Sequence, residues 1–108
     1  MGAVTAAERM ADAIEAAALA CGLCVADRVA TAARYWRGRE EYGSGAGTIT
    51  APEFDGLRHA REELLDAHNY IAVAAAHGQM SAEAAAALLA ANATVLRLLA
   101  EVRVGGGQ

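Results

Sequence analysis

The sequence predicts a small, soluble, all-α protein, built as a bundle of about four helices. Three observations predict this class. About thirty of the 108 residues are alanine, the best helix former. Apolar residues recur at intervals of three and four along most of the chain, as they do on one face of a helix. Helix start and stop signals then divide the chain into four segments.

The first expected helix starts near Thr5, because Thr5 and Glu8 have the form of a capping box. Gly22 should end or bend this helix, and a second should run from Cys24 to about Gly38. The two cysteines are expected to be buried as small apolar residues. The expected core faces are Ala7, Met10, Ile14, Ala17, Ala18 and Cys21, and then Val25, Val29, Ala32, Ala33 and Trp36.

A glycine-rich loop over residues 43–49, interpreted as a linker or mobile lid, separates these helices from the next pair. Thr50 and Glu53 form a second capping-box pattern, with a proline between them, so a third helix should begin here. It should run to about His77, where Gly78 supplies a stop signal.

The last helix should begin after Ser81 and run to about Val102. It is apolar around most of its circumference, which predicts burial on several sides and hence a homodimer or a higher homo-oligomer. Residues 1–104 are expected to form a single helical domain, and residues 105–108 a disordered tail.

Composition excludes several classes of partner from the prediction. The formal net charge is −4, so we expect no binding to nucleic acid, which requires a basic footprint. Residues 84–100 form the most apolar run, but Asn92 and Arg97 interrupt it, so we expect no membrane span and a cytoplasmic location. All nine basic residues are arginine, which indicates a GC-rich genome, such as that of an actinobacterium or its phage.

The third expected helix carries a polar stripe of His59, Glu63, Asp66 and Tyr70, spaced three or four residues apart. The stripe should lie at the edge of the core, and the expected core face of this helix is Leu57, Leu64, Ile71 and Ala75. Between the polar stripe and this core face, small residues should leave open space at Ala60, Ala67 and Ala74. Two carboxylates at this spacing repel each other. A divalent cation such as Mg²⁺ or Mn²⁺ would relieve that repulsion and leave positions for phosphate oxygens.

The segment Arg-Glu-Glu-Leu-Leu-Asp-Ala-His-Asn-Tyr over residues 61–70 resembles the second metal-binding helix of the all-α nucleoside triphosphate pyrophosphohydrolases. These are the MazG-like and dimeric dUTPase-like enzymes and their small phage relatives. Glu63 and Asp66 match the Glu-x-x-Asp motif of the family, and Arg-Glu-Glu-Tyr-Gly over residues 39–43 is similar to a segment that precedes this helix in phage members. The resemblance covers about residues 37–77.

The resemblance implies a helical, usually dimeric protein that uses Mg²⁺ to split a nucleoside triphosphate into a monophosphate and pyrophosphate. It implies that Glu63 and Asp66 are catalytic metal ligands, with Glu62 as an alternative ligand. The residues expected to contact the substrate are His59, Asn69, Tyr70, Arg37, Arg39 and Tyr42. There are two interpretations of Arg37 and Arg39. They are solvated surface side chains, or they bind the phosphates of the substrate through their planar guanidinium groups.

This sequence departs from the family pattern, because it lacks the upstream Glu-x-x-Glu pair. Either Asp12 and Glu15 substitute for that pair or catalysis is weakened or absent. One alternative is therefore a non-catalytic phage protein that sequesters a signalling nucleotide, linear or cyclic. A helical protein-interaction module is another. A purely structural interpretation, in which Arg58 pairs with Glu62 across one helical turn, also stays open.

Overall fold

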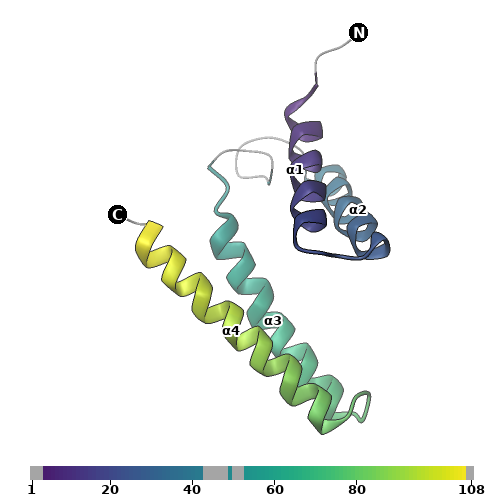
Figure 1. Cartoon of the computed structure of the whole chain (residues 1–108), viewed down its shortest axis with the longest axis vertical. Coiled ribbons are helices and arrows are strands. Elements are labelled where there is room, and N and C mark those ends of the chain that lie inside the picture. The colour runs from purple at the N-terminus through teal and green to yellow at the C-terminus, as the bar shows by residue number, and fades with distance from the viewer. Residues whose placement is uncertain (1–3, 43–48, 50–52, 107–108) are drawn as a thin grey trace. The chain divides into compact units, whose positions relative to one another are not determined.

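The computed structural model describes residues 4–42, 49 and 53–106. This part of the chain contains no strand, and it confirms an all-α protein of four helices. The helices are α1 (Ala6–Ala20), α2 (Val25–Tyr42), α3 (Gly56–Ala76) and α4 (Ala82–Gly106) (Figure 1). The chain divides into two units, Met1–Phe54 and Asp55–Gln108, and each unit is a pair of helices that pack on each other. The single domain over residues 1–104 stays a prediction.

The ends of α1 confirm the start and stop signals of the sequence. The backbone N–H of Glu8 donates to the Thr5 hydroxyl oxygen at 3.1 Å, which caps the helix. Gly22 has a φ of +82° after the last turn, and the N–H of Leu23 donates to the carbonyl of Ala18 at 3.0 Å. This is the Schellman arrangement that glycine favours. The predicted end of the second helix near Gly38 is wrong, because α2 continues past Gly38, whose φ is not positive, to Tyr42.

The predicted core faces of the α1–α2 unit are confirmed only in part, with Ala7 and Ala18 buried and Ile14 and Ala32 half-buried. On α1 the buried residues are Ala7, Ala11 and Ala18, whereas Met10 is exposed. On α2 the ring of Tyr35 is 4% exposed, and the predicted core residues Val25, Val29 and Trp36 are 64%, 61% and 40% exposed. Among the described residues of this unit, the buried side chains are therefore three alanines of α1 and the ring of Tyr35 on α2.

Both cysteines are free and exposed, so the prediction that they are buried is wrong. Cys21 is the C-terminal cap of α1, and Cys24 directly precedes α2. The turn holds both residues outside the packed faces of the helices. The thiol of Cys21 donates to the Ala18 carbonyl at 3.4 Å, within its own helix end.

Helix α3 begins later than the capping-box pattern at Thr50 and Glu53 predicted. Glu53 lies in a turn, and Asp55 is the cap, accepting the backbone N–H of Arg58 at 3.0 Å. Residues 50–52 lie outside the described residues, as do residues 43–48 of the glycine-rich loop. A short acidic cap next to Gly56 therefore overrides the upstream signal.

The turn between α3 and α4 follows the prediction closely. Gly78 has a φ of +73°, and the N–H of Gln79 donates to the carbonyl of Ala74 at 2.9 Å. The hydroxyl of Ser81 then accepts the N–H of Ala84 at 3.0 Å and caps α4. Helix α4 runs to Gly106 and so includes two residues of the predicted tail, whereas residues 107–108 lie outside the described residues.

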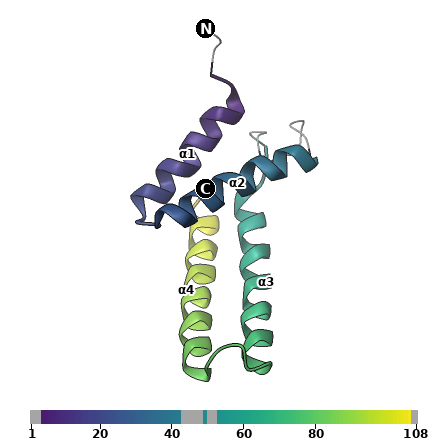
Figure 2. The ribbon, with the colours of Figure 1, turned by 90° about the vertical axis from the view of Figure 1, so that its right-hand side faces the viewer.

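Helices α3 and α4 lie side by side and antiparallel in both views (Figures 1 and 2). Their facing side chains are buried or half-buried at alternating intervals of four and three residues, the spacing of a coiled-coil seam. On α3 these residues are Ala60, Leu64, Ala67, Ile71 and Ala74; on α4 they are Ala85, Leu89, Asn92, Leu96 and Leu99. The predicted α3 core face is confirmed except for Leu57, which is 39% exposed. The alanine positions are packing positions and not open space.

Asn92 is the buried polar residue of this seam. Its side-chain amide donates to the carbonyl oxygen of Leu64 at 2.8 Å, which brings these two residues to the same level of the antiparallel pair. The seam is thin, since no large side chain of the described residues is fully buried.

Ala82–Val102 is also long and apolar enough to cross a membrane, by length and composition alone.

Candidate functional site

The predicted site lies on one helix, α3, along a stripe that borders the α3–α4 seam. Helical geometry places His59, Glu63, Asp66 and Tyr70 about 100° around the axis from the centre of the seam-facing residues. The side chain of His59 is half-buried, and those of Glu63, Asp66 and Tyr70 are exposed. This agrees with the expectation that the stripe lies at the edge of the core.

The three acidic candidates on α3 differ in their surroundings. Arg58 donates to the carboxylate of Glu62 at 3.1 Å, and its Nε lies 3.9 Å from the carboxylate of Asp55. Glu63 and Asp66 make no ion pair or side-chain hydrogen bond with the described residues. Glu62 therefore has a neutralising partner, as the structural interpretation predicted, whereas Glu63 and Asp66 have none within the described part of the chain.

The chemistry open to Glu63 and Asp66 is that of two hard oxygen ligands on successive turns of one helix face. Mg²⁺ is commonly held by one or two carboxylates, with water and substrate phosphates completing its octahedron. The pair fits that role as one side of a site. Among the described residues, no group of three or more histidine, cysteine, aspartate or glutamate side chains could hold a metal ion together.

The other α3 candidates flank this pair. Tyr70 is 72% exposed, so its ring is available to a ligand, and Asn69 is exposed beside it. The guanidinium of Arg58 contacts Nε2 of His59 at 3.3 Å, and since arginine can only donate, the imidazole nitrogen accepts. His59 is therefore oriented by its neighbour on the same helix turn.

The predicted phosphate and base contacts on α2 belong to the other unit. Arg37 is exposed. Arg39 is half-buried, with its guanidinium carbon 5.9 Å from the ring centre of Trp36 and its Nε lacking a hydrogen-bond partner among the described residues. Tyr42 ends α2, and its side chain lies outside the described residues. A clamp formed by these residues and the α3 stripe stays a prediction.

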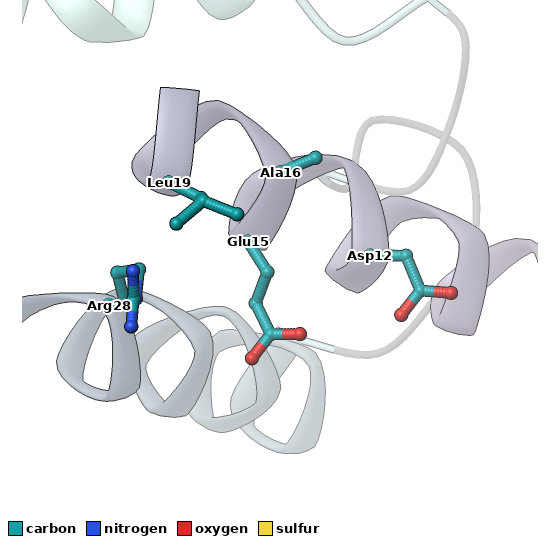
Figure 3. Close-up of a pocket in the computed structure, with 5 residues that line it drawn as sticks. All are labelled: Asp12, Glu15, Ala16, Leu19 and Arg28. Carbon is teal, nitrogen blue, oxygen red and sulfur yellow. The ribbon is translucent and has the colours of Figure 1, made fainter. Parts of the chain in front are cut away.

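Asp12 and Glu15, the proposed substitutes for the missing acidic pair, line an open pocket of about 320 Å³ in the α1–α2 unit. Figure 3 shows the Glu15 side chain extending from α1 toward α2, which carries Arg28 at the same pocket. Asp12 lies one turn earlier on α1. The pocket thus combines two carboxylates with a guanidinium group, and a role for these carboxylates beside Glu63 stays a prediction.

Sequence reasoning missed the structural role of Asn92. In the sequence it was only an interruption in an apolar run, whereas its amide is the polar contact between α3 and α4. The signal that could have identified it is its register, since it lies four residues before Leu96 and three after Leu89 on the seam. Arg28 was missed for a different reason, because nothing near it in sequence marks the pocket on the neighbouring helix.

No protein-family model, curated protein or solved structure matches the chain.

Proposed function

We propose that the chain binds a nucleotide together with Mg²⁺ on the exposed stripe of α3, with Glu63 and Asp66 as the metal ligands. One observation carries the proposal: these two carboxylates are exposed and without a cationic partner among the described residues, although Arg58 lies on the same helix and pairs with Glu62. Two adjacent unpaired carboxylates destabilise an isolated helix slightly. A bound cation would remove this repulsion, and that relief would favour cation binding.

The remaining residues of the stripe suit the other parts of a nucleotide. Tyr70 follows Glu63 by two helical turns, about 10 Å along the axis. A ligand lying along α3 would hold its phosphates near the carboxylates and its base against the exposed ring. Asn69 would supply an amide for a base edge or sugar hydroxyl, and His59 a ring nitrogen near the phosphates.

When bound, Mg²⁺ would neutralise phosphate charge and polarise a phosphoryl oxygen. We propose binding as the primary function, because hydrolysis in the family that this sequence resembles uses a second acidic pair. Asp12 and Glu15 are the candidates for that pair. If they serve, the products are a nucleoside monophosphate and pyrophosphate; if they do not, the protein sequesters an intact nucleotide.

Equilibrium dialysis against linear and cyclic nucleotides, with and without Mg²⁺, tests the site. We expect the double substitution Glu63→Gln and Asp66→Asn to weaken nucleotide binding at least tenfold, because it removes both anionic ligands. The matched control is Glu62→Gln, a neighbouring carboxylate that already has a partner, and its affinity should stay within about twofold. Equal losses in both variants, or none in either, would contradict the assignment of Glu63 and Asp66.

Chromatography of the dialysate and of the heat-released fraction separates the two outcomes for the bound nucleotide. Conversion to monophosphate and pyrophosphate identifies a hydrolase, and Asp12→Asn with Glu15→Gln should then abolish turnover without abolishing binding. Recovery of the intact nucleotide identifies a sequestering protein.

A second candidate function is a helical protein-interaction module. The specific observation in its favour is the exposure of large aliphatic side chains along α4, namely Leu88, Val95, Leu98 and Val102. This function requires no ligand on α3. It would be favoured if no nucleotide in the panel were depleted.

A further inference from the structure

The turn between α1 and α2 carries the two cysteines of the chain, and both are free and exposed. Cysteine is among the most often buried residue types, and a free cysteine usually packs as a small apolar side chain. Neither Cys21 nor Cys24 contributes to the core of the hairpin, so packing does not explain why they lie within four residues of each other. Two accessible thiols at one turn are instead suited to bind a ligand that prefers sulfur.

Backbone hydrogen bonds on both sides of the turn fix the positions of the two cysteines. Before the turn, the N–H of Leu23 donates to the carbonyl of Ala18 at 3.0 Å and closes the end of α1. After the turn, the N–H of Arg28 donates to the carbonyl of Cys24 at 2.9 Å, which is the first backbone hydrogen bond of α2. The two thiols are therefore presented from a backbone that is already ordered, and a ligand need not organise it.

The spacing of the cysteines favours a bridging ion over a disulfide bond. Two α-carbons three residues apart lie at most about 11 Å from each other, and a disulfide requires less than about 7 Å and an S–S bond of about 2 Å. An ion held by two sulfur atoms joins them across about 4.6 Å, since a thiolate–metal bond is about 2.3 Å long, as at zinc. A bridging ion therefore fits a wider range of turn geometries. The thiol of Cys21, which donates to the Ala18 carbonyl at 3.4 Å, has only to leave that weak acceptor.

The number of ligands selects the class of ion. Within the described part of the chain, no group of three or more histidine, cysteine, aspartate or glutamate side chains could hold a metal ion together. A structural zinc site needs about four such ligands. Thiolates are soft ligands that select Cu(I), which accepts two ligands in a linear arrangement. We propose that Cys21 and Cys24 together bind one soft monovalent cation of the Cu(I) type.

Binding exchanges protons for the metal ion and involves no electron transfer. Each thiol loses its proton to solvent, and each sulfur forms one bond to the ion. The sulfur atoms and the Cu(I) ion keep their oxidation states. Two thiolates and one monovalent cation give a complex with one net negative charge, so a positive group beside the turn would stabilise the bound state.

Arg28 supplies a positive group beside the turn. It lies four residues after Cys24, one helical turn along the same side of α2. Its side chain is half-buried and forms no ion pair with the described residues, although it lines an open pocket with Asp12 and Glu15 (Figure 3). Asp27 is the opposing charge on this turn of α2, and it is exposed to solvent, which screens it more strongly than the half-buried guanidinium.

Anaerobic titration of the reduced full chain with Cu(I), in competition with the Cu(I) chelator bicinchoninate, tests the site. We expect one ion per chain, and Cys21→Ser or Cys24→Ser alone should weaken the affinity at least about a hundredfold, because each leaves a single thiolate ligand.

The matched control is Met10→Leu. Met10 is the other soft ligand described in this hairpin, and it lies about 16 Å along α1 from Cys21, too far to join the site. Its substitution should leave the affinity within about twofold. No retained ion, one ion per two chains, or equal losses in the cysteine and methionine variants would overturn the proposal.

X-ray absorption at the copper edge tests the ligand set. We expect two sulfur ligands and no oxygen or nitrogen ligand. Asp27→Asn should leave this spectrum unchanged and should not weaken binding, since the carboxylate is a neighbouring charge and not a ligand. A third ligand that disappears in Asp27→Asn would overturn the two-thiolate site, and so would recovery of a Cys21–Cys24 disulfide with no metal retained.

The role of Arg28 has its own pair of variants. Arg28→Gln should weaken Cu(I) affinity by about three- to tenfold at low salt, because it removes the counter-charge of the anionic complex. Arg34→Gln, at an exposed position of α2 that is not one turn from Cys24, should change the affinity by less than about twofold. Equal effects in the two variants would overturn the assignment of Arg28.

The proposal does not rest on nucleotide binding, because the thiols and the Glu63–Asp66 pair lie on different hairpins. Glu63→Gln with Asp66→Asn should leave Cu(I) affinity within about twofold, and Cys21→Ser with Cys24→Ser should do the same for nucleotide affinity. Loss of Cu(I) binding in the carboxylate variant would overturn the thiol site, whereas loss of nucleotide binding alone would leave it intact.

Discussion

The two hairpins have the same turns and different interiors. Each first helix ends at a glycine with positive φ, Gly22 or Gly78, followed by the same backbone hydrogen bond to the carbonyl five residues back. Inside, the α1–α2 hairpin buries alanines and one aromatic ring, that of Tyr35. The α3–α4 hairpin instead has an aliphatic seam with a single amide, that of Asn92. Similar local signals therefore enclose two different kinds of core.

The difference teaches that the most apolar face of a helix need not be the packed one. In α2 the valines at positions 25 and 29 are exposed, while Tyr35 beside Trp36 is buried. The two rings meet edge to face, with centres 5.3 Å apart. In α3 the packed face is nearly the expected one. The first hairpin should therefore depend on one side chain, and the second on many small contributions.

The largest effect should come from Tyr35→Ala in the first hairpin. Removing a buried aromatic ring costs about 3 to 5 kcal/mol of unfolding free energy. Chemical denaturation followed by far-ultraviolet circular dichroism measures it. Trp36→Ala is the matched control, because Trp36 is adjacent and 40% exposed, and it should cost clearly less. Similar costs would mean that the first hairpin is not organised around Tyr35.

In the second hairpin, Asn92→Asp should produce the next largest effect. The change replaces a donor to the Leu64 carbonyl with an ionised acceptor of the same shape, so a buried carboxylate would face a carbonyl oxygen. We expect a loss of about 2 to 3 kcal/mol at neutral pH, measured by the same denaturation. Asn69→Asp, at an exposed position of α3, should change stability by less than about 0.5 kcal/mol. If Asn92→Asp were tolerated as well as the control, the seam contact would be contradicted.

The turns should respond equally, which tests the shared part of the comparison. Gly22→Ala and Gly78→Ala each force a β-carbon into a positive-φ conformation, at a cost of about 1 to 2 kcal/mol. A β-carbon at either site would meet no atom within 4 Å, so no steric term separates them. Denaturation midpoints of the two variants measure the difference. A gap above about 1 kcal/mol would show that the hairpins differ at their turns as well.

The smallest effect should come from the surface pair on α3. Arg58→Ala removes the ion pair between Arg58 and Glu62, and the side chains of these two residues are 55% and 53% exposed. The substitution should lower the free energy of unfolding by about 0.3 to 0.5 kcal/mol. The loss should shrink at high salt, because ions screen exposed pairs. Glu62→Ala in the Arg58→Ala background should add almost nothing, and an additive loss would mean that the residues act independently.

Local chemistry explains what the sequence could predict. The caps at Thr5 and Ser81 and the stops at Gly22 and Gly78 depend on neighbouring residues, so spacing in the chain reveals them. The start of α3 was misplaced because two capping signals compete, and Asp55 wins over the earlier one. The burial of Tyr35 depends on how closely α1 approaches α2, and no local signal encodes that distance.

The site follows the same division. The stripe of His59, Glu63, Asp66 and Tyr70 follows from helical periodicity alone, and so does the pairing of Arg58 with Glu62. The pocket that joins Asp12 and Glu15 to Arg28 depends on the packing of two helices, which the sequence does not encode locally. A ligand contact that involves both α2 and α3 is still harder to predict from the sequence, because it depends on how the two units are arranged.

The helices pack in pairs that are consecutive in the sequence, α1 with α2 and α3 with α4. This pairing determines the order in which the two hairpins can fold during synthesis. Contacts between residues that are near each other in the sequence require only short loops to form. Helical hairpins of this kind therefore form in microseconds to milliseconds. A ribosome adds roughly 5 to 20 residues per second. The α1–α2 hairpin can therefore be complete seconds before α4 has left the ribosome. A defect at Tyr35 should reveal itself before α4 emerges, whereas a defect at Asn92 can act only after α4 has emerged.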